Sequence, residues 1–132
     1  MAASRHLVLL AARLGAGWAR AKLLPRLRDL FSARDGSYLQ RITVLYALKD
    51  FILAPDAGDA ANDVLDLLVA GLRDAVPNVR LVAAAAVRGA LAGGVFDGAR
   101  VAREVRPALE ALLADADLDV RAAATELAAL AA

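Results

Sequence analysis

The chain has 132 residues, enough for one domain with a modest hydrophobic core. It is 60% hydrophobic and rich in alanine, the best helix former, which favours an all-α fold. It has no cysteine, which excludes a disulfide framework and a thiolate metal site, and its net charge of +1 favours no polyanionic partner.

The charge is distributed unevenly along the chain. Residues 1–51 carry nine Lys/Arg and three Asp/Glu, whereas residues 52–132 carry seven and twelve. A basic half can bind nucleic acid or an acidic protein, but a solvated helix face is the commoner explanation. No segment reaches the roughly 18 charge-free apolar residues that a membrane span requires. The lack of cysteine fits a reducing compartment, and we expect a cytoplasmic location that can extend to the nucleus.

The first segment, residues 1–16, is predicted to be a helix. Its apolar run "LVLLAA" lies between His6 and Arg13 and is too short for a signal-peptide core. The first 28 residues contain five Arg, one Lys and no acid, a composition shared with mitochondrial transit peptides. We prefer the interpretation that this is an ordinary basic helix at the start of the domain.

Two kinds of amphipathic segment then alternate along the chain. The first kind covers residues 23–31, 63–73 and 105–114. Pro25 and Pro107 lie near the start of two of these segments, where a helix tolerates proline in its first turn.

The second kind of segment begins near an arginine. Its small and apolar residues recur with a helical period, and breaker-rich stretches at 54–63 and 92–100 separate the successive units. The apolar faces predicted for these three helices comprise Val44, Ala47, Leu48 and Phe51, then Ala83, Ala86, Val87, Ala90 and Leu91, then Ala124, Leu127, Ala128 and Ala131.

An Asp six residues before an Arg recurs three times, between the two kinds of helix. The three Arg residues are 39 and 41 positions apart, so each unit has a helix, a turn with the Asp, and a second helix with the Arg near its start. Units of about 40 residues with this plan predict an all-α fold of the HEAT-repeat α-solenoid kind, a right-handed superhelix of antiparallel helix pairs. The predicted units are 18–53, 61–92 and 100–132, preceded by 1–16 as the second helix of a truncated unit.

In a stacked solenoid the Asp of one unit can reach the Arg of its neighbour and form a ladder. An exposed ion pair contributes only about 0–1 kcal/mol, so the ladder is expected to fix the stacking register, while helix packing supplies most of the stability. An Asp near a helix start can also cap free N–H groups. The predicted ladder residues are Asp35, Arg41, Asp74, Arg80, Asp115 and Arg121.

Several stretches in order resemble one family. They are "RLGAGWARAKLLPRL" (13–27), "SYLQRITVLYAL" (37–48), "VPNVRLVAAAAV" (76–87), "EVRPALEALLADADLDVR" (104–121) and "ELAALAA" (126–132). This set resembles the C-terminal HEAT repeats of the scaffold (A, regulatory) subunit of the type 2A serine/threonine protein phosphatase. The resemblance covers nearly the whole chain and implies about three and a half repeats.

The resemblance implies a non-catalytic scaffold whose intra-repeat turns bind a phosphatase catalytic subunit. We favour Tyr38 most among the implied contacts, since a tyrosine in a turn has apolar area and a polar tip; packing between adjacent turns is its alternative role. Trp18 is expected to be structural. The sequence departs from the family at Leu81 and at Ala122 and Ala123, where the family has aromatic residues. The implied contacts are Tyr38, Leu39, Arg41, Pro77, Asn78, Val79, Arg80, Leu81, Asp117, Leu118 and Asp119.

The sequence offers little for catalysis. His6 is the single histidine, and there is neither a cysteine nucleophile nor a set of His, Asp and Asn ligands for two metals. The glycine pair in "LAGGVFDG" lies between predicted helices, not after a strand, and is interpreted as a linker. We therefore expect no enzymatic activity, no cofactor, no metal and no small-molecule substrate.

Three alternatives to the phosphatase scaffold remain open. The chain can be a generic HEAT adaptor for another protein, a truncated remnant of a scaffold subunit, or, with less support, a nucleic-acid-binding module. The predicted first helix has Leu7, Leu10 and Leu14 on one side, so self-association through that end is also expected.

Overall fold

The computed structural model describes residues 18–33, 36–52 and 60–131, and in these ranges every regular element is a helix. The all-α expectation is therefore confirmed for the described residues. The elements in chain order are η1 (Ala19–Leu23), α2 (Leu24–Ser32), α3 (Tyr38–Ile52), α4 (Ala60–Asp63), α5 (Leu65–Leu72), α6 (Pro77–Gly93), α7 (Gly98–Arg100), η2 (Val101–Val105), α8 (Arg106–Leu112) and α9 (Leu118–Ala131).

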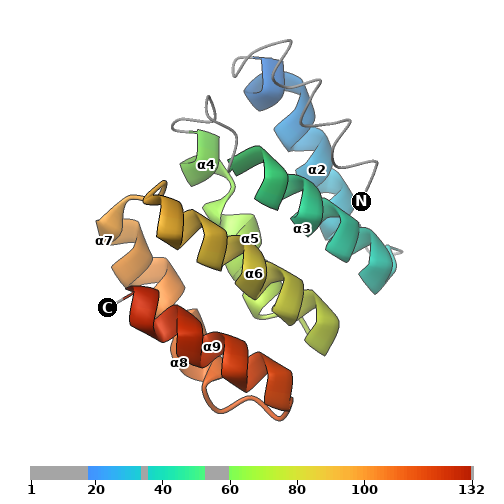
Figure 1. Cartoon of the computed structure of the whole chain (residues 1–132). Coiled ribbons are helices and arrows are strands. Elements are labelled where there is room, and N and C mark those ends of the chain that lie inside the picture. Colours follow the sequence, from blue (N-terminus) through green and yellow to red (C-terminus); the bar gives the residue numbers. More distant parts are fainter. Residues whose placement is uncertain (1–17, 34–35, 53–59, 132) are drawn as a thin grey trace.

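The helices form two layers. In one layer α3, α6 and α9 lie side by side, with α6 packed against both neighbours (Figure 1). The other layer holds α2, α5 and α8, each joined by a short turn to the helix that follows it. The chain thus forms three successive helix pairs, α2–α3, α5–α6 and α8–α9, and we refer to them as the first, second and third pair.

The core lies between the two layers and runs through all three pairs. It includes the fully buried Leu45, Leu68 and Leu127, one from each pair. The apolar faces predicted for α3, α6 and α9 are buried, except that Leu91 and Ala128 are only partly so. The helical period of small and apolar residues therefore predicted these faces correctly.

Two glycines meet specific backbone requirements. A Cβ atom at Gly71 would lie 2.8 Å from Ala83 Cβ and 3.2 Å from Leu45 Cδ1, so this residue lets α5 approach α6 and α3 closely. Gly94 ends α6 with φ = 64°, and Val95 N–H donates to Ala90 O, the closing bond of a left-handed helix cap.

The prolines of α2 and α8 each follow a π-helical turn. Pro25 follows η1 and Pro107 follows η2, and each helix continues without a break into the α-helical segment. Proline lacks an N–H and its ring collides with the carbonyl four residues earlier, so a wider turn just before it accommodates the ring. The two prolines therefore lie inside longer helical runs.

Some sequence predictions fall outside the described residues. These are the helix over 1–16, its self-association through Leu7, Leu10 and Leu14, and the ladder role of Asp35. Trp18, which is described, packs against the core. The second and third helical runs begin at Ala60 and Gly98, one and two residues before the predicted unit starts.

Candidate functional site

The turn edge of the molecule holds most of the residues singled out by sequence. We use this name for the described residues that connect the helices of each pair, 33, 36–37, 73–76 and 113–117, together with the first turn of the helix that follows each. The three turns begin at the C-terminal ends of α2, α5 and α8, so the two-layer packing brings them to one edge of the molecule (Figure 1).

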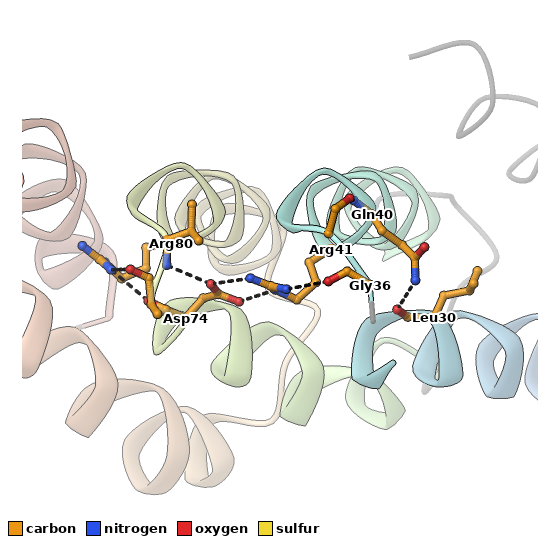
Figure 2. A network of polar contacts seen from close by, with 9 residues as sticks. Leu30, Gly36, Gln40, Arg41, Asp74 and Arg80 are labelled. Carbon is orange, nitrogen blue, oxygen red and sulfur yellow. Dashed lines mark hydrogen bonds and ion pairs between the residues drawn. The ribbon is translucent and has the colours of Figure 1, made fainter. Parts of the chain in front are cut away.

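Arg41 of the first pair binds Asp74 of the second pair. Arg41 Nε lies 2.6 Å from Asp74 Oδ2, and Nη2 lies 3.1 Å from Oδ1, which is a bidentate contact (Figure 2). The two side chains are only 22% and 9% exposed. A bidentate pair shielded from water in this way is stronger and more directional than an ordinary surface ion pair.

Arg80 of the second pair binds Asp115 of the third pair by a single hydrogen bond. Its Nη2 lies 2.9 Å from Asp115 Oδ1, and both side chains are largely buried. Nη1 donates to the carbonyls of Asp74 and Ala75, 2.8 and 3.1 Å away. Arg80 Nε is buried and has no partner among the described residues.

Each of the two Asp residues also shapes its own turn. Asp74 Oδ1 accepts from Val76 N–H, and Asp115 Oδ1 accepts from Asp117 N–H, both at 2.9 Å. Such a bond from a residue's own carboxylate to the N–H two positions later is the Asx-turn that favours Asp in turns. One carboxylate therefore both shapes a turn and links two helix pairs.

The contacts keep these carboxylates ionised. Burial opposes ionisation of Asp74, but hydrogen bonds from Arg41 and Val76, with the charges of Arg41 and Arg80, place its pKa below the ordinary value. The pKa of Asp115 is lowered chiefly by the N–H of Asp117 and then by Arg80, against the effect of burial. The hydrogen bond to Asp74 also raises the pKa of Arg41 above its usual value.

The structure thus describes two Arg–Asp rungs of the predicted six-residue ladder. Each rung is an ion pair that joins neighbouring helix pairs. Asp35, which lies outside the described residues, cannot be placed. Arg121 is exposed and forms no ion pair within the described residues, although its charge contributes to the low pKa of Asp115. At the first turn, Gln40 Nε2 donates to Leu30 O at 2.8 Å and Arg41 Nη1 lies 3.4 Å from Gly36 O (Figure 2).

Large apolar side chains are exposed next to these turns. Among the described residues five large hydrophobic side chains are exposed, and Leu130 is the one that lies away from the turn edge. The other four are Tyr38, Leu39, Leu113 and Leu118. Sequence reasoning missed Leu113, because the period of α8 does not distinguish it from its neighbour Leu112, which is buried.

The predicted contact residues divide by accessibility. Pro77, Asn78 and Asp119 are exposed like the apolar residues, and Asp117 and Leu81 are half-buried. Arg41 and Arg80 are occupied by the ladder.

The prediction that Val79 contacts a partner is wrong. Val79 has no exposed surface, because the residue just before the ladder arginine points into the core. Val120 occupies the same position in the third pair and is buried as well.

A second set of arginine contacts links the pairs away from the turn edge. Arg28 of α2 binds the carboxylate of Asp66 and the carbonyl of Asp63. Arg100 binds Glu104 and the carbonyl of Asn62, whose side-chain oxygen accepts from Asp97 N–H. The sequence analysis missed these contacts, because Arg28 binds residues later in the chain, Arg100 binds a residue earlier in it, and two of the acceptors are backbone carbonyls.

Searches for other sites and for relatives return negative findings. The described residues contain no group of three or more His, Cys, Asp or Glu side chains placed to hold a metal ion. None of the described helices combines the length and apolarity needed to cross a membrane. Comparison of the chain with protein-family models and with curated proteins finds no match.

Proposed function

We propose that the chain is a HEAT-repeat α-solenoid that acts as a non-catalytic protein scaffold. Three helix pairs in two layers, linked by two Arg–Asp rungs of the same kind, support the repeat interpretation. In such proteins each repeat contacts its neighbours, and aligned turns form an extended surface for partners.

One observation supports the turn edge as the working surface. Four of the five large hydrophobic side chains exposed in the described residues lie there. Apolar side chains gathered on one edge mark interaction sites, and tyrosine is enriched at interfaces relative to the rest of the surface. The ladder holds the turns beneath them in place, which limits the ordering entropy lost on binding.

The partner we propose is the catalytic subunit of a type 2A serine/threonine phosphatase. This choice of partner rests on the resemblance of the ordered sequence stretches to the phosphatase scaffold. It is compatible with the exposure of four of the implied contacts, Tyr38, Leu39, Pro77 and Leu118. The chain itself contributes surface and no chemistry. Neither a cofactor nor a metal belongs to this function.

The test is calorimetric titration of the chain with a purified type 2A catalytic subunit. Tyr38→Ala and Leu118→Ala should each weaken binding by about 1–2 kcal/mol, roughly five- to thirtyfold in Kd, as expected for interface anchors. Leu130→Ala is the matched control, because Leu130 is 45% exposed, like Tyr38 at 44%, but lies away from the turn edge.

Two results would contradict the proposal. If the folded chain does not bind the catalytic subunit, the phosphatase partner is wrong and a different adaptor role remains. If Leu130→Ala weakens binding as much as Leu118→Ala while helicity is unchanged, the turn edge is not the binding surface.

A further inference from the structure

The three turns of the turn edge differ in the side chains that surround their ladder arginines. Two positions before each ladder arginine stand Leu39, Asn78 and Asp119. Four positions before it stand Ser37, Val76 and Asp117. The third turn is therefore the one that places carboxylates on both sides of an exposed apolar residue, Leu118.

Apolar surface is also most exposed at the third turn. Leu118 is 71% exposed, the largest fraction among the big hydrophobic side chains that the structure describes. Leu113, at 44%, flanks the other end of the same turn. Two leucines of one chain segment thus border a short acidic turn.

Not all of the acidic side chains at this turn have a structural role. Asp115 holds Arg80, and Asp117 Oδ1 accepts from Val120 N–H at 3.0 Å as a helix cap. Asp119 is exposed and makes no hydrogen bond or ion pair within the described residues. Arg121, the nearest cation along the helix, pairs with neither Asp117 nor Asp119 in the part of the chain that is described.

We infer that the third turn binds a protein segment in which an apolar side chain is flanked by lysine or arginine. Leu113 and Leu118 supply the apolar contact, and Asp119 together with the half-buried carboxylate of Asp117 supplies the complementary charge. This inference rests on the proposed function for the surface, and it adds the chemistry of the partner.

The test is a titration followed by leucine methyl NMR on the full chain. The probes are two acetylated peptides of equal length and leucine content, one with leucine between two lysines and one with leucine between two glutamates. The lysine peptide should shift the Leu113 and Leu118 methyl signals and bind about fivefold tighter than the glutamate peptide, a difference of the size that exposed charges produce. Added salt should reduce this preference.

Two charge-neutralising variants provide the matched comparison. Asp119→Asn should bring the two peptide affinities to within about twofold of each other. Asp29→Asn removes the same charge from an exposed position on α2, in the first pair, and should leave the preference unchanged.

Three outcomes would overturn the inference. They are equal affinity for the two peptides, methyl shifts confined to Leu39, or no shift of Leu113 and Leu118 at the solubility limit of the lysine peptide. If one of these outcomes is found but Leu118→Ala still weakens binding of the catalytic subunit, the proposed function stands and only the inferred preference for a basic segment is wrong. If the lysine preference appears without phosphatase binding, the turn is a basic-segment site and the phosphatase partner is wrong.

Discussion

Asp74 shows how much a single side chain does at the turn edge. It accepts two hydrogen bonds from Arg41 across the boundary between pairs and one from Val76 N–H within its own turn. Its pairing with the preceding arginine follows from the recurring Asp and Arg spacing, which is visible in the sequence. The sequence does not show that Arg80 Nε is unpaired, because the spacing is the same whether Arg80 forms one hydrogen bond to Asp115 or two.

Asp74→Ala should lower the free energy of unfolding by about 2 kcal/mol, because it leaves a largely buried guanidinium without its carboxylate. Asp66→Ala is the control: it removes an exposed pair with Arg28, in which both side chains are about half exposed, and should cost less than about 1 kcal/mol. Urea unfolding followed by circular dichroism measures both values. Equal losses would show that burial of the Asp74 pair does not strengthen it.

Individual positions on the surface were harder to predict than the core. The period of the helices predicted the buried faces of α3, α6 and α9, since alanine and leucine recur there every three or four residues. Val79 lies four residues before Ala83, so the helical period places it on the buried face, whereas the family resemblance marks the whole turn as contacts. Leu112 and Leu113 are both leucine, so the sequence alone does not distinguish them. Leu112 is the last residue of α8 and is buried, whereas Leu113 follows the helix and is exposed.

At the scale of elements, the closeness of α5 to α6 depends on one glycine. Glycine inside a helix normally lowers helix stability by about 1 kcal/mol relative to alanine, so helix propensity alone does not favour Gly71. The 2.8 Å separation that a Cβ atom would have from Ala83 explains it. The sequence shows the glycine but not the partner across the interface, which comes from the packing of two helices.

Gly71→Ala should destabilise the protein by about 1–2 kcal/mol, because overpacking at the helix interface outweighs the gain in helix propensity. Ala83→Gly removes the methyl group that opposes the new side chain. The double variant should therefore be more stable than the sum of the two single-variant effects predicts. Thermal unfolding of the two single variants and the double variant measures this coupling. A stabilising Gly71→Ala would mean that α5 and α6 separate at no cost.

Over the whole molecule, acidic side chains with lowered pKa connect the pairs from end to end. Asp66, Asp74 and Asp115 each bind an arginine of another helix pair. In all three the hydrogen bonds outweigh burial, so the pKa of each carboxyl is lower in the folded chain than in the unfolded one. The second set of arginine contacts could not be predicted, because Arg28 binds residues later in the chain whereas Arg100 binds a residue earlier in it.

The protein should therefore lose stability in acid. The pKa of Asp in the unfolded chain is about 3.9. The stability that these carboxylates add to the folded state is therefore complete above that pH, and it is lost as the pH falls through their lower folded-state pKa values. Urea unfolding at a series of pH values from about 7 down to about 2.5 measures the effect. The double variant Asp74→Ala/Asp115→Ala should show a shallower decline than the wild type. Parallel curves would mean that these two residues do not contribute to the acid dependence.

The repeated rungs also determine which changes of chain length the fold can accept. Arg41 and Arg80 stand 39 residues apart, and each receives an Asp from the pair that follows it. Duplicating or excising one whole helix pair would present each arginine with an equivalent aspartate, whereas an insertion of a few residues next to Asp74 or Asp115 would displace that carboxylate from the arginine of the preceding pair. The fold can therefore gain or lose whole helix pairs more easily than single residues within a turn. Small changes of length are best tolerated in the connections between pairs.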